Sequence, residues 1–596
     1  MSNQEHVIAV IGAGPRGTSF LERLLAHVEQ QAIRTQSELP PLRVLVIDPA
    51  RHGSGKIWDP EQSPRYLMNT PASFPTAAPA GATQEELTPS SCSTSFLQWA
   101  KKQGLAYNDG DFPRRADYGA YLRWLHQEAV SGLRANGVSV EEIPDEVTSI
   151  SAGKNWYGLL MAQGPAREAN AVILALGHVP AEPAGPAARL SSQAQKLGLH
   201  YQVPAIPTDV DYNRFEAGEN VLVRGMGLNF FDLMIEVTAG RGGRFKQHLS
   251  GDPGHRLDYQ PSGQEPILIA GSRRGTPYRA KTVAPGFVPE GVELTQLTDE
   301  VIEELIREHQ QLDFAAHLWP LIEADMQQTY RRIGGDPQAE FKLEEFTRPF
   351  DHQFFGSAQE YQQAMATWLT EDAATAAEGA QNPQKMAVNA LHAARLKVKH
   401  LVTERRITQT SLLRDVEGWF EATVEGLTSG PPLQRIEELA ALARAGIVQF
   451  LGPSPVYGVE HDEGLFIADS SAVSGARYTA RYMIEAMMPP NRITQSSAPL
   501  VRSLLEAGTA RPATFRAGGE SHVHKGFAVT DSPHRLLTSR DSVVEGIYVL
   551  GLQLSSAQWG TAIAAEAGGQ ITTTARSLAD ADAVVVDILS RAPSRG

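Results

Sequence analysis

Three glycines near the start of the chain have the spacing of a phosphate-binding turn. Gly12, Gly14 and Gly17 follow the apolar run 6–11 and precede apolar residues at helical spacing. Strand, Gly-x-Gly-x-x-Gly and helix in this order are typical of a dinucleotide-binding unit, in which a pyrophosphate meets the helix N-terminus. The next apolar strand ends at Asp48, whose carboxylate can bind an adenosine ribose. The residues assigned to this nucleotide site are Gly12, Gly14, Pro15, Arg16, Gly17 and Asp48.

Two further strands that end in glycine lie far along the chain. Residues 171–176 are apolar and lead to Gly177, and the similar segment 546–550 leads to Gly551. Two-nucleotide flavoproteins carry strands of this kind beside the flavin, and their chains return there near the C-terminus. Leu-Gln follows Gly551 here in place of the common Gly-Asp. These segments predict that the bound nucleotide is FAD. The residues added to its site are Gly177, Gly551, Trp559 and Thr561.

A second Gly-x-Gly turn lies inside the chain. The apolar strand 221–224 runs into Gly225-Met-Gly227, and Phe230 stands where a third glycine is usual. Another strand, 266–270, comes after a glycine-rich stretch (240–264) that we interpret as an insertion. Two arginines follow this strand, as an adenosine 2′-phosphate requires, whereas a carboxylate there would select NAD. A solvated basic face is the alternative. The residues assigned to an NADPH site are Gly225, Gly227, Ser272, Arg273 and Arg274.

The composition narrows the chemistry. The 596 residues include a single cysteine, Cys92, so the chain has no intrachain disulfide, C-x-x-C pair or four-thiolate metal centre. Redox chemistry must therefore use a bound organic cofactor. The formal net charge of -15 argues against a nucleic-acid or anionic-membrane partner. No apolar run reaches the roughly 20 residues that span a bilayer, and we expect a cytoplasmic protein.

These elements predict an α/β fold with two Rossmann-like dinucleotide-binding domains, for FAD and NADPH, and a mostly helical insertion. The insertion is indicated by apolar residues at helical spacing from about residue 293 to residue 445. No set of histidines and carboxylates has the spacing of a metal site, and we interpret the pair His522 and His524 as loop residues. The expected domains are an FAD-binding part over 1–205, an NADPH-binding domain over 206–290, a helical substrate lobe over 291–445 and a second FAD-binding part over 446–596.

Six segments match a known family: 12–24, 67–70, 113–115, 118–122, 240–245 and 272–278. In these segments the chain resembles the bacterial FAD/NAD(P)-binding proteins that include the FAD-dependent urate hydroxylase and the aspartate N-monooxygenase (nitrosuccinate synthase). They are spread over nearly the whole chain, and its length suits the aspartate enzymes better. The resemblance implies NADPH-dependent flavin monooxygenation through a flavin C4a-hydroperoxide. By motif position it makes Asn69 and Arg114 catalytic candidates near the flavin, although a structural role for Arg114 is equally open.

The resemblance and three cations together predict a small charged amino acid as substrate, with aspartate first, hydroxylated on its amine. Arg279, Lys281 and Arg348 are the candidates for binding its carboxylates, and the alternative is that each is a surface charge. Three other functions stay open: hydroxylation of a purine such as urate, electron transfer by an FAD/NADPH dehydrogenase without oxygen insertion, and nucleotide sensing by a scaffold. The expected partners are a small-molecule substrate and molecular oxygen. The sequence leaves the oligomeric state open.

Overall fold

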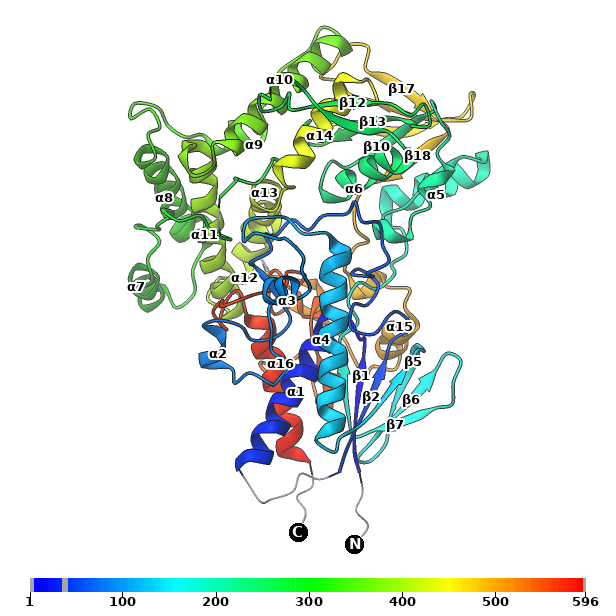
Figure 1. Cartoon of the computed structure of the whole chain (residues 1–596), viewed down its shortest axis with the longest axis vertical. Helices are drawn as coiled ribbons and strands as arrows, with labels where there is room; N and C mark the ends of the chain where they lie inside the picture. Colours follow the sequence, from blue (N-terminus) through cyan, green and yellow to red (C-terminus); the bar gives the residue numbers. More distant parts are fainter. Residues whose placement is uncertain (1–4, 35–40, 250, 285, 518, 593–596) are drawn as a thin grey trace. The chain divides into compact units, whose positions relative to one another are not determined.

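The chain divides into two compact units. The computed structural model describes residues 5–34, 41–249, 251–284, 286–517 and 519–592. Unit 1 comprises Met1–Glu182, Leu396–Thr410 and Pro490–Gly596, and unit 2 comprises Pro183–Arg395 and Ser411–Pro489. Each unit is built around its own sheet of mainly parallel strands (Figure 1), which confirms the predicted α/β fold with two Rossmann-like sheets.

Unit 1 contains a six-stranded sheet in the order β21-β22-β8-β1-β2-β4, parallel except for the edge strand β21. The strands are β1 (His6–Ile11), β2 (Leu42–Ile47), β4 (Ser139–Ile143), β8 (Ala171–Leu174), β21 (Arg535–Leu537) and β22 (Val543–Val549). The side chains of Ile8 and Val10 enter one core, and those of Ala9 and Ile11 enter the other. Because both faces of the sheet are covered, the strand β1 is a continuous apolar run.

Helices cover one face of this sheet, and a smaller sheet covers much of the other. α1 (Pro15–Arg34), α4 (Arg115–Ala135) and α16 (Arg576–Arg591) pack on the first face (Figure 1). The second face carries β5 (Val147–Ala152), β6 (Tyr157–Met161), β7 (Arg167–Ala169) and α15 (Pro499–Glu506). Unit 1 also contains α2 (Thr83–Glu86), α3 (Phe96–Lys102), the pair β3 (Pro75–Thr76) and β23 (Ala565–Glu566), and the hairpin β19 (Pro512–Ala517) and β20 (Glu520–Phe527).

Unit 2 contains a five-stranded parallel sheet in the order β14-β13-β10-β18-β9. The strands are β9 (His200–Gln202), β10 (Asn220–Arg224), β13 (Ile267–Ser272), β14 (Val448–Pro453) and β18 (Tyr482–Glu485). One face packs against α6 (Leu228–Val237), α10 (Ala358–Ala377) and α14 (Leu433–Arg444). The other packs against α5 (Gly185–Leu197) and the small sheet of β15 (Val456–Glu460), β16 (Leu465–Asp469) and β17 (Arg477–Ala480).

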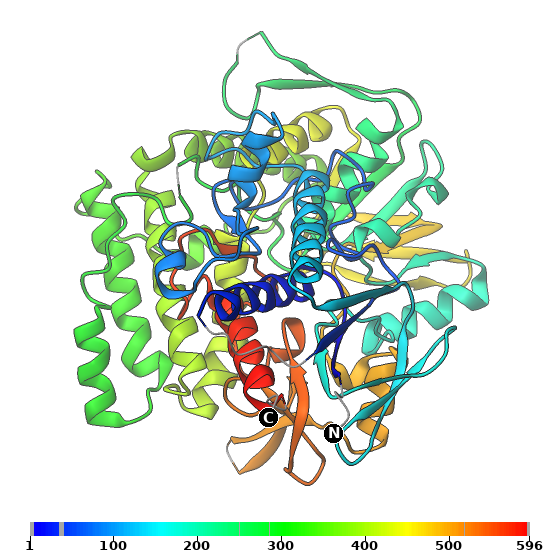
Figure 2. The same ribbon diagram turned by 60° about the horizontal axis from the view of Figure 1, so that its bottom comes forward.

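The region from residue 299 to residue 444 is helical, as the sequence predicts (green to yellow in Figure 2). Its other helices are α7 (Asp299–His309), α8 (Trp319–Arg332), α9 (Leu343–Thr347), α11 (Pro383–Thr403), α12 (Gln409–Ser411) and α13 (Glu421–Thr428), with π-helical turns at Phe314–Leu318 and Leu412–Phe420. The stretch interpreted as an insertion forms a hairpin of β11 (Arg244–Gln247) and β12 (Leu257–Gln260). No helix among the described residues is long and apolar enough to cross a membrane.

The boundaries of the units differ from those expected from the sequence. The strand at 447–451, expected to begin the return to the FAD-binding part, lies in β14 and pairs with β13 of unit 2. β9, expected within the first FAD-binding part, pairs with β18 of the same sheet. α10 and α14 pack on that sheet instead of forming a separate lobe. A short apolar strand fits any parallel sheet, so only tertiary pairing determines which unit it joins.

A buried carboxylate connects two segments of unit 2. Asp372 has no exposed surface and accepts hydrogen bonds from Lys385 Nζ at 2.8 Å, Arg279 Nη1 at 3.1 Å and the Ala280 amide at 2.6 Å. Burial alone would raise the pKa of Asp372, but Lys385 and Arg279 hold that pKa below its ordinary value. One carboxylate therefore pairs with two largely buried cations, and the segment after β13 depends on it.

We expect Asp372→Asn to reduce the free energy of unfolding by about 3–5 kcal/mol, because two buried cations would lose their counter-charge. Chemical denaturation followed by circular dichroism measures this loss. Glu371→Gln is the control, because Glu371 is the exposed neighbour on α10 and its change should cost less than about 0.5 kcal/mol. Equal effects of the two substitutions would contradict the structural role of Asp372.

Candidate functional site

The first glycine turn of unit 1 requires two of its glycines for close backbone contact. Gly12 has a φ of +101°, and a Cβ atom there would lie 2.2 Å from the carbonyl oxygen of Ala175, just after β8. A Cβ atom on Gly17 would lie 2.2 Å from the carbonyl oxygen of Gly12. The turn is therefore held tightly between β8 and the start of α1, as the sequence motif predicts.

Gly14 lies in the same turn but has open space beside it. The nearest atom to a Cβ there would be the Cα of Gly55, at 3.8 Å. α1 begins at the next residue, Pro15, so the amides of its first turn and its positive dipole end lie at this opening. An open backbone beside a helix N-terminus fits the pyrophosphate of a dinucleotide.

The other residues predicted for the FAD site converge on this turn. Asp48 accepts hydrogen bonds from the amides of Ala13 and Ala50, both at 2.7 Å. Arg16 Nη2 donates to the carbonyl oxygens of Thr561, at 3.0 Å, and Ile563, at 2.6 Å. Burial lowers the pKa of Arg16. The structure thus places the C-terminal segment beside the first turn within unit 1.

The glycine-ended strands also meet as expected. Gly551 follows β22 with a φ of +85°, and a Cβ there would lie 3.0 Å from Arg16 Cγ. Gln553, two residues after Gly551, donates from Nε2 to the carbonyl oxygen of Gly177 at 2.8 Å. Trp559 is buried. Gln553 therefore connects the ends of the two strands. From the sequence, this residue was noted only because the common Gly-Asp ending is absent.

The segments that carry Asn69 and Arg114 lie side by side. Leu67 and Arg114 form an isolated β-bridge, and the Met68 amide donates to the carbonyl oxygen of Pro113 at 2.8 Å. Arg114 is the N-cap residue of α4, and its side chain is exposed. The structure brings the two candidates to one place in unit 1, and their role toward the flavin stays a prediction.

The second turn, in unit 2, is built on the same principle but is more closed. Gly225 has a φ of +109° and donates its amide to the carbonyl oxygen of Gly271 at 2.9 Å. Gly227 precedes α6, and a Cβ on it would lie 3.4 Å from the ring of Tyr278. Phe230, in the position of the missing third glycine, is fully buried against Phe231. Phe230, which replaces the third glycine of the motif, therefore contributes to the hydrophobic core of unit 2.

The residues after β13 differ in what they contact. Arg273 is exposed, and the structure gives its side chain no hydrogen bond or ion pair within the described chain. The guanidinium of Arg274 donates to the carbonyl oxygen of Ala422 at 2.6 Å and lies over the ring of Tyr278, 5.6 Å from its centroid. Ser272 Oγ donates to the carbonyl oxygen of Thr276 at 2.8 Å. Arg273 is thus the cation that is available to a 2′-phosphate.

The three predicted substrate residues also differ. All three nitrogens of the Arg279 guanidinium are used: Nε and Nη2 donate to the carbonyl oxygen of Phe346, and Nη1 donates to Asp372. Arg348 is exposed and lies 3.4 Å from Asp351. Lys281 is partly buried, and its Nζ lies 5.6 Å from the centroid of the Phe287 ring. Burial, with Arg395 nearby, lowers the pKa of Lys281 to about 7.

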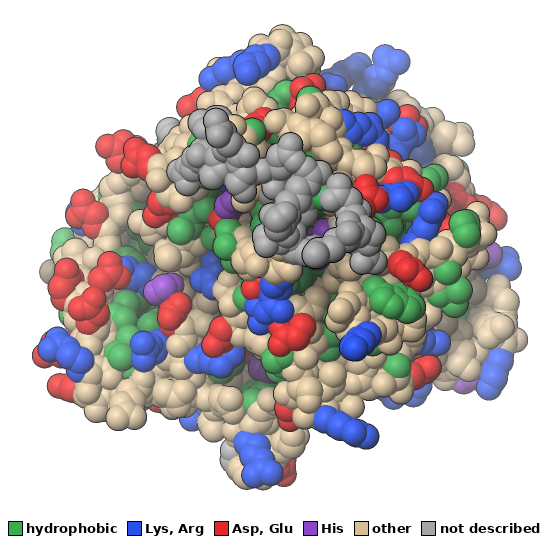
Figure 3. Space-filling view, turned by 90° about the horizontal axis from the view of Figure 1, so that it is seen from below, with side chains coloured by type: hydrophobic (Ala, Val, Ile, Leu, Met, Phe, Trp, Pro, Cys, Tyr) green, Lys and Arg blue, Asp and Glu red, His purple; other side chains and the backbone are tan. Residues whose placement is uncertain are grey.

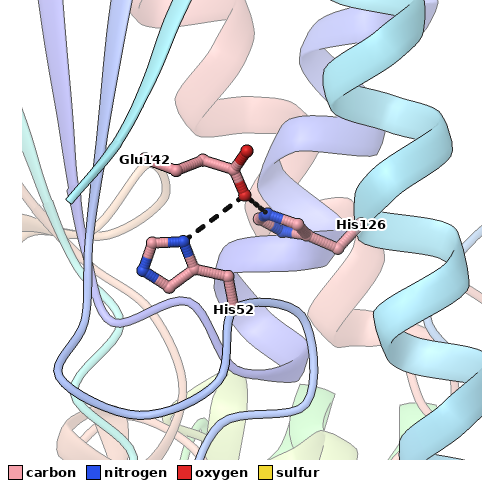
Figure 4. A group of neighbouring side chains, drawn as sticks. All are labelled: His52, His126 and Glu142. Atoms are coloured by element: carbon pink, nitrogen blue, oxygen red, sulfur yellow. Dashed lines mark hydrogen bonds and ion pairs between the residues drawn. The ribbon is translucent and has the colours of Figure 1, made fainter. Parts of the chain in front are cut away.

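Sequence reasoning missed a group of His52, His126 and Glu142 in unit 1, because 74 and 16 residues separate its members along the chain (Figure 4). Glu142 Oε1 lies 2.9 Å from His126 Nε2 and 3.4 Å from His52 Nδ1. Two ligand atoms of a tetrahedral zinc ion are about 3.3 Å apart, so the shorter distance is that of a hydrogen bond. The hydrogen bond from His126 lowers the pKa of Glu142 to about 2.

Two parallel sheets, each with a strand, a glycine turn and a helix, define a protein that binds two dinucleotides. A family model described as FAD-NAD(P)-binding matches residues 9–179. The L-aspartate N-monooxygenase (nitrosuccinate-forming) of Streptomyces cremeus is 31% identical, over 100% of this chain and 96% of that protein. The nitrosuccinic acid synthase of Aspergillus oryzae is 32% identical, over 98% and 93%.

Solved structures match at lower similarity. The bacillithiol disulfide reductase of Bacillus cereus has a TM-score of 0.37 and 12% identity, with coverage of 99% of this chain and 100% of that chain. From the two curated relatives, the chain belongs to the FAD/NAD(P)-binding flavoprotein family that contains the nitrosuccinate-forming L-aspartate N-monooxygenases. This confirms the predicted family, with FAD and NADPH as cofactors.

Gly14→Ala should leave the protein folded but poor in FAD, because the methyl group fits the unit and occupies the approach of the pyrophosphate. Gly17→Ala should instead cost about 2 kcal/mol or more of stability, since its methyl group meets backbone. Flavin absorbance per protein and the thermal midpoint of the apoprotein separate the two effects. A Gly14→Ala protein that binds a full complement of FAD would contradict this assignment of the turn.

Arg273→Ala should raise the KM for NADPH by roughly 10- to 100-fold and leave NADH unchanged, because a charged contact to the 2′-phosphate is lost. Arg274→Ala should affect both coenzymes alike, because its guanidinium contacts Ala422 and Tyr278 beside the second turn. Steady-state kinetics with each coenzyme make the comparison. If Arg273→Ala raised the KM for NADPH and for NADH by the same factor, Arg273 would not bind the 2′-phosphate.

Proposed function

We propose that the protein is an NADPH-dependent flavin monooxygenase that oxygenates the amine nitrogen of L-aspartate. The observation that carries the proposal is similarity to named L-aspartate N-monooxygenases over the whole chain, across both nucleotide-binding sheets and the helical region. Bound FAD would supply the acceptance of a hydride from NADPH and the activation of molecular oxygen. The protein's own residues bind and orient the nucleotides and the substrate and exclude water.

The single cysteine supports oxygenation over thiol chemistry. Cys92 is buried in unit 1, and its Sγ lies 3.3 Å from the hydroxyl of Ser90. Burial raises the pKa of Cys92 to about 12, so the thiol stays protonated and unreactive at neutral pH. Electrons from the flavin therefore do not pass through a cysteine of this chain.

Lys281 is the strongest candidate to bind a carboxylate of the substrate. Arg279 is committed to Asp372 and Phe346, and Arg348 is exposed beside Asp351. Lys281 is partly buried near Arg395 and His392, which is itself 2% exposed. Buried cations that lie close together lower one another's pKa values, because the charged forms repel and are poorly solvated. A bound carboxylate would offset this repulsion. A carboxylate of a dicarboxylic amino acid would give Lys281 a counter-charge.

The proposed activity is tested with purified holoenzyme. L-Aspartate should speed NADPH oxidation and oxygen consumption together and yield an N-oxygenated product by mass spectrometry. D-Aspartate, L-glutamate and urate are the comparison substrates. If urate stimulates turnover and aspartate does not, the enzyme is a purine hydroxylase. If NADPH oxidation with an organic acceptor persists without oxygen and aspartate has no effect, it is a dehydrogenase.

Lys281→Met should raise the KM for L-aspartate by about 10- to 100-fold, with flavin content unchanged, because a charged contact to a carboxylate is lost. Arg348→Met is the matched control and should change that KM less than about threefold, since surface ion pairs contribute little. Steady-state kinetics measure both values. A larger effect in Arg348→Met would move the carboxylate site to the exposed arginine.

The same lysine should make the KM for aspartate depend on pH. Because burial lowers the pKa of free Lys281 to about 7, the lysine loses its charge as pH rises through 7, and the KM should rise. kcat should increase over the same range, because only the neutral amine of the substrate can be oxygenated. In Lys281→Met the KM should be flat between pH 6 and 8, roughly one unit either side of that pKa. A pH-dependent KM in the variant would exclude Lys281 as its source.

A further inference from the structure

The segment that follows β2 in unit 1 is bonded to the first glycine turn on its inner side. This segment, residues 48–55, begins with Asp48, which accepts the Ala13 amide at 2.7 Å. The Gly53 amide donates to the carbonyl oxygen of Ala13 at 2.7 Å, and Thr18 Oγ1 donates to that of Gly53 at 3.1 Å. The proposed ribose ligand and the turn that faces the pyrophosphate therefore move as one body.

The outer side of the same segment is held by the group in Figure 4. His52 Nε2 lies 3.2 Å from the carbonyl oxygen of Asp48, and its Nδ1 faces Glu142 Oε1 at 3.4 Å. His126, on α4, approaches the same oxygen with Nε2 at 2.9 Å. Glu142 lies on β4, and Arg134 Nη2 lies 3.5 Å from its other oxygen.

The segment also packs closely against α4 at Gly53. Gly53 has a φ of +93°, and a Cβ on it would lie 2.7 Å from Arg123 Cα and 2.8 Å from His126 Cβ. His126 is 1% exposed, so its ring is fixed by the core of the unit. The carboxylate of Glu142 thus connects a fixed ring on α4 to the ring of His52 on the segment.

The ring of His52 lies between two acceptor oxygens. His52 can satisfy the carbonyl oxygen of Asp48 only by donating from Nε2, and it then faces the carboxylate with Nδ1. Hydrogen bonds from the two histidines favour the ionised form of Glu142 and lower its pKa. His52 therefore contacts Glu142 with one ring nitrogen and Asp48 with the other.

We infer that Glu142, with His52 and His126, is a positioning group for FAD: it holds the 48–55 segment so that Asp48 meets the ribose and Gly14 stays open to the pyrophosphate. The inference rests on the assignment of Asp48 to the FAD site. None of the three side chains contacts the glycine turn directly, so they act through Asp48 and Gly53. A segment released from α4 and β4 must be ordered again when FAD binds, which weakens binding.

The inference is tested by reconstituting apoprotein with FAD and following flavin fluorescence. Glu142→Gln and His52→Ala should each raise the FAD dissociation constant about 5- to 20-fold. Asp582→Asn is the matched control, because Asp582 makes the same 2.9 Å bond to His27 within unit 1 but away from the segment. The thermal midpoint of the three apoproteins should fall by similar amounts. An equal rise of the FAD dissociation constant in Asp582→Asn would overturn the inference.

A double-mutant cycle distinguishes this inference from the assignment on which it rests. Asp48→Ala alone should weaken FAD binding, and failure of that result would overturn the assignment of Asp48. If Asp48→Ala weakens binding and Glu142→Gln weakens it further by the same factor as in the native protein, the positioning role is wrong. If Glu142→Gln adds less than about twofold in the Asp48→Ala background, Glu142 acts through Asp48. Asp48→Asn, which keeps one acceptor oxygen, serves where Asp48→Ala does not fold.

Zinc provides the remaining comparison. Zinc chloride added during reconstitution should leave the FAD dissociation constant of the native protein unchanged, because His126 and Glu142 share a proton at hydrogen-bond distance. Saturable tightening by zinc that disappears in His52→Ala would replace the positioning hydrogen bonds with a metal site.

Discussion

The close approach of backbone at Gly12 is the constraint on which unit 1 depends. The carbonyl oxygen of Gly12 occupies the place of a side chain at Gly17, and the carbonyl oxygen of Ala175 occupies that of a side chain at Gly12. β8, the turn and α1 are therefore fixed relative to one another without any side chain between them. Asp48 and Arg16 then connect this fixed turn to the strand β2 and to the C-terminal segment.

Ionised carboxylates in both units connect segments that are distant in the sequence. Asp372 joins the segment after β13 to α10 and α11, and Glu142 joins the segment after β2 to α4. Asp372 is fully buried, and a buried charge is costly unless every partner is present, so it favours one arrangement of the chain over others. The net charge of -15 does not form one acidic patch on the face in Figure 3, where basic and acidic side chains are intermixed.

The sequence predicted the parts of the fold that local patterns determine. Apolar runs followed by glycine turns and helices located β1, α1, β10 and α6, because each pattern lies within about 30 residues. The unit to which β14 belongs could not be predicted, since a short apolar strand carries no information about its neighbours. His52, His126 and Glu142 were missed for the same reason: their proximity follows from β2 pairing with β4 and from the packing of α4. Arg279 was chosen for its charge, and only the structure reveals Asp372 as its partner.

The two glycine turns differ in a way that suits two cofactors with different lifetimes on the enzyme. Gly14 has open space beside it in unit 1, and the segments around it are fastened by Asp48, Gly53 and Arg16. The space beside Gly227 is narrower, because a Cβ atom there would lie 3.4 Å from the ring of Tyr278, and the nearby Arg273 is exposed. We expect a dinucleotide at the second turn to order the long side chain of Arg273, which costs conformational entropy. We therefore expect FAD to bind the fastened first turn more tightly than NADPH binds the second.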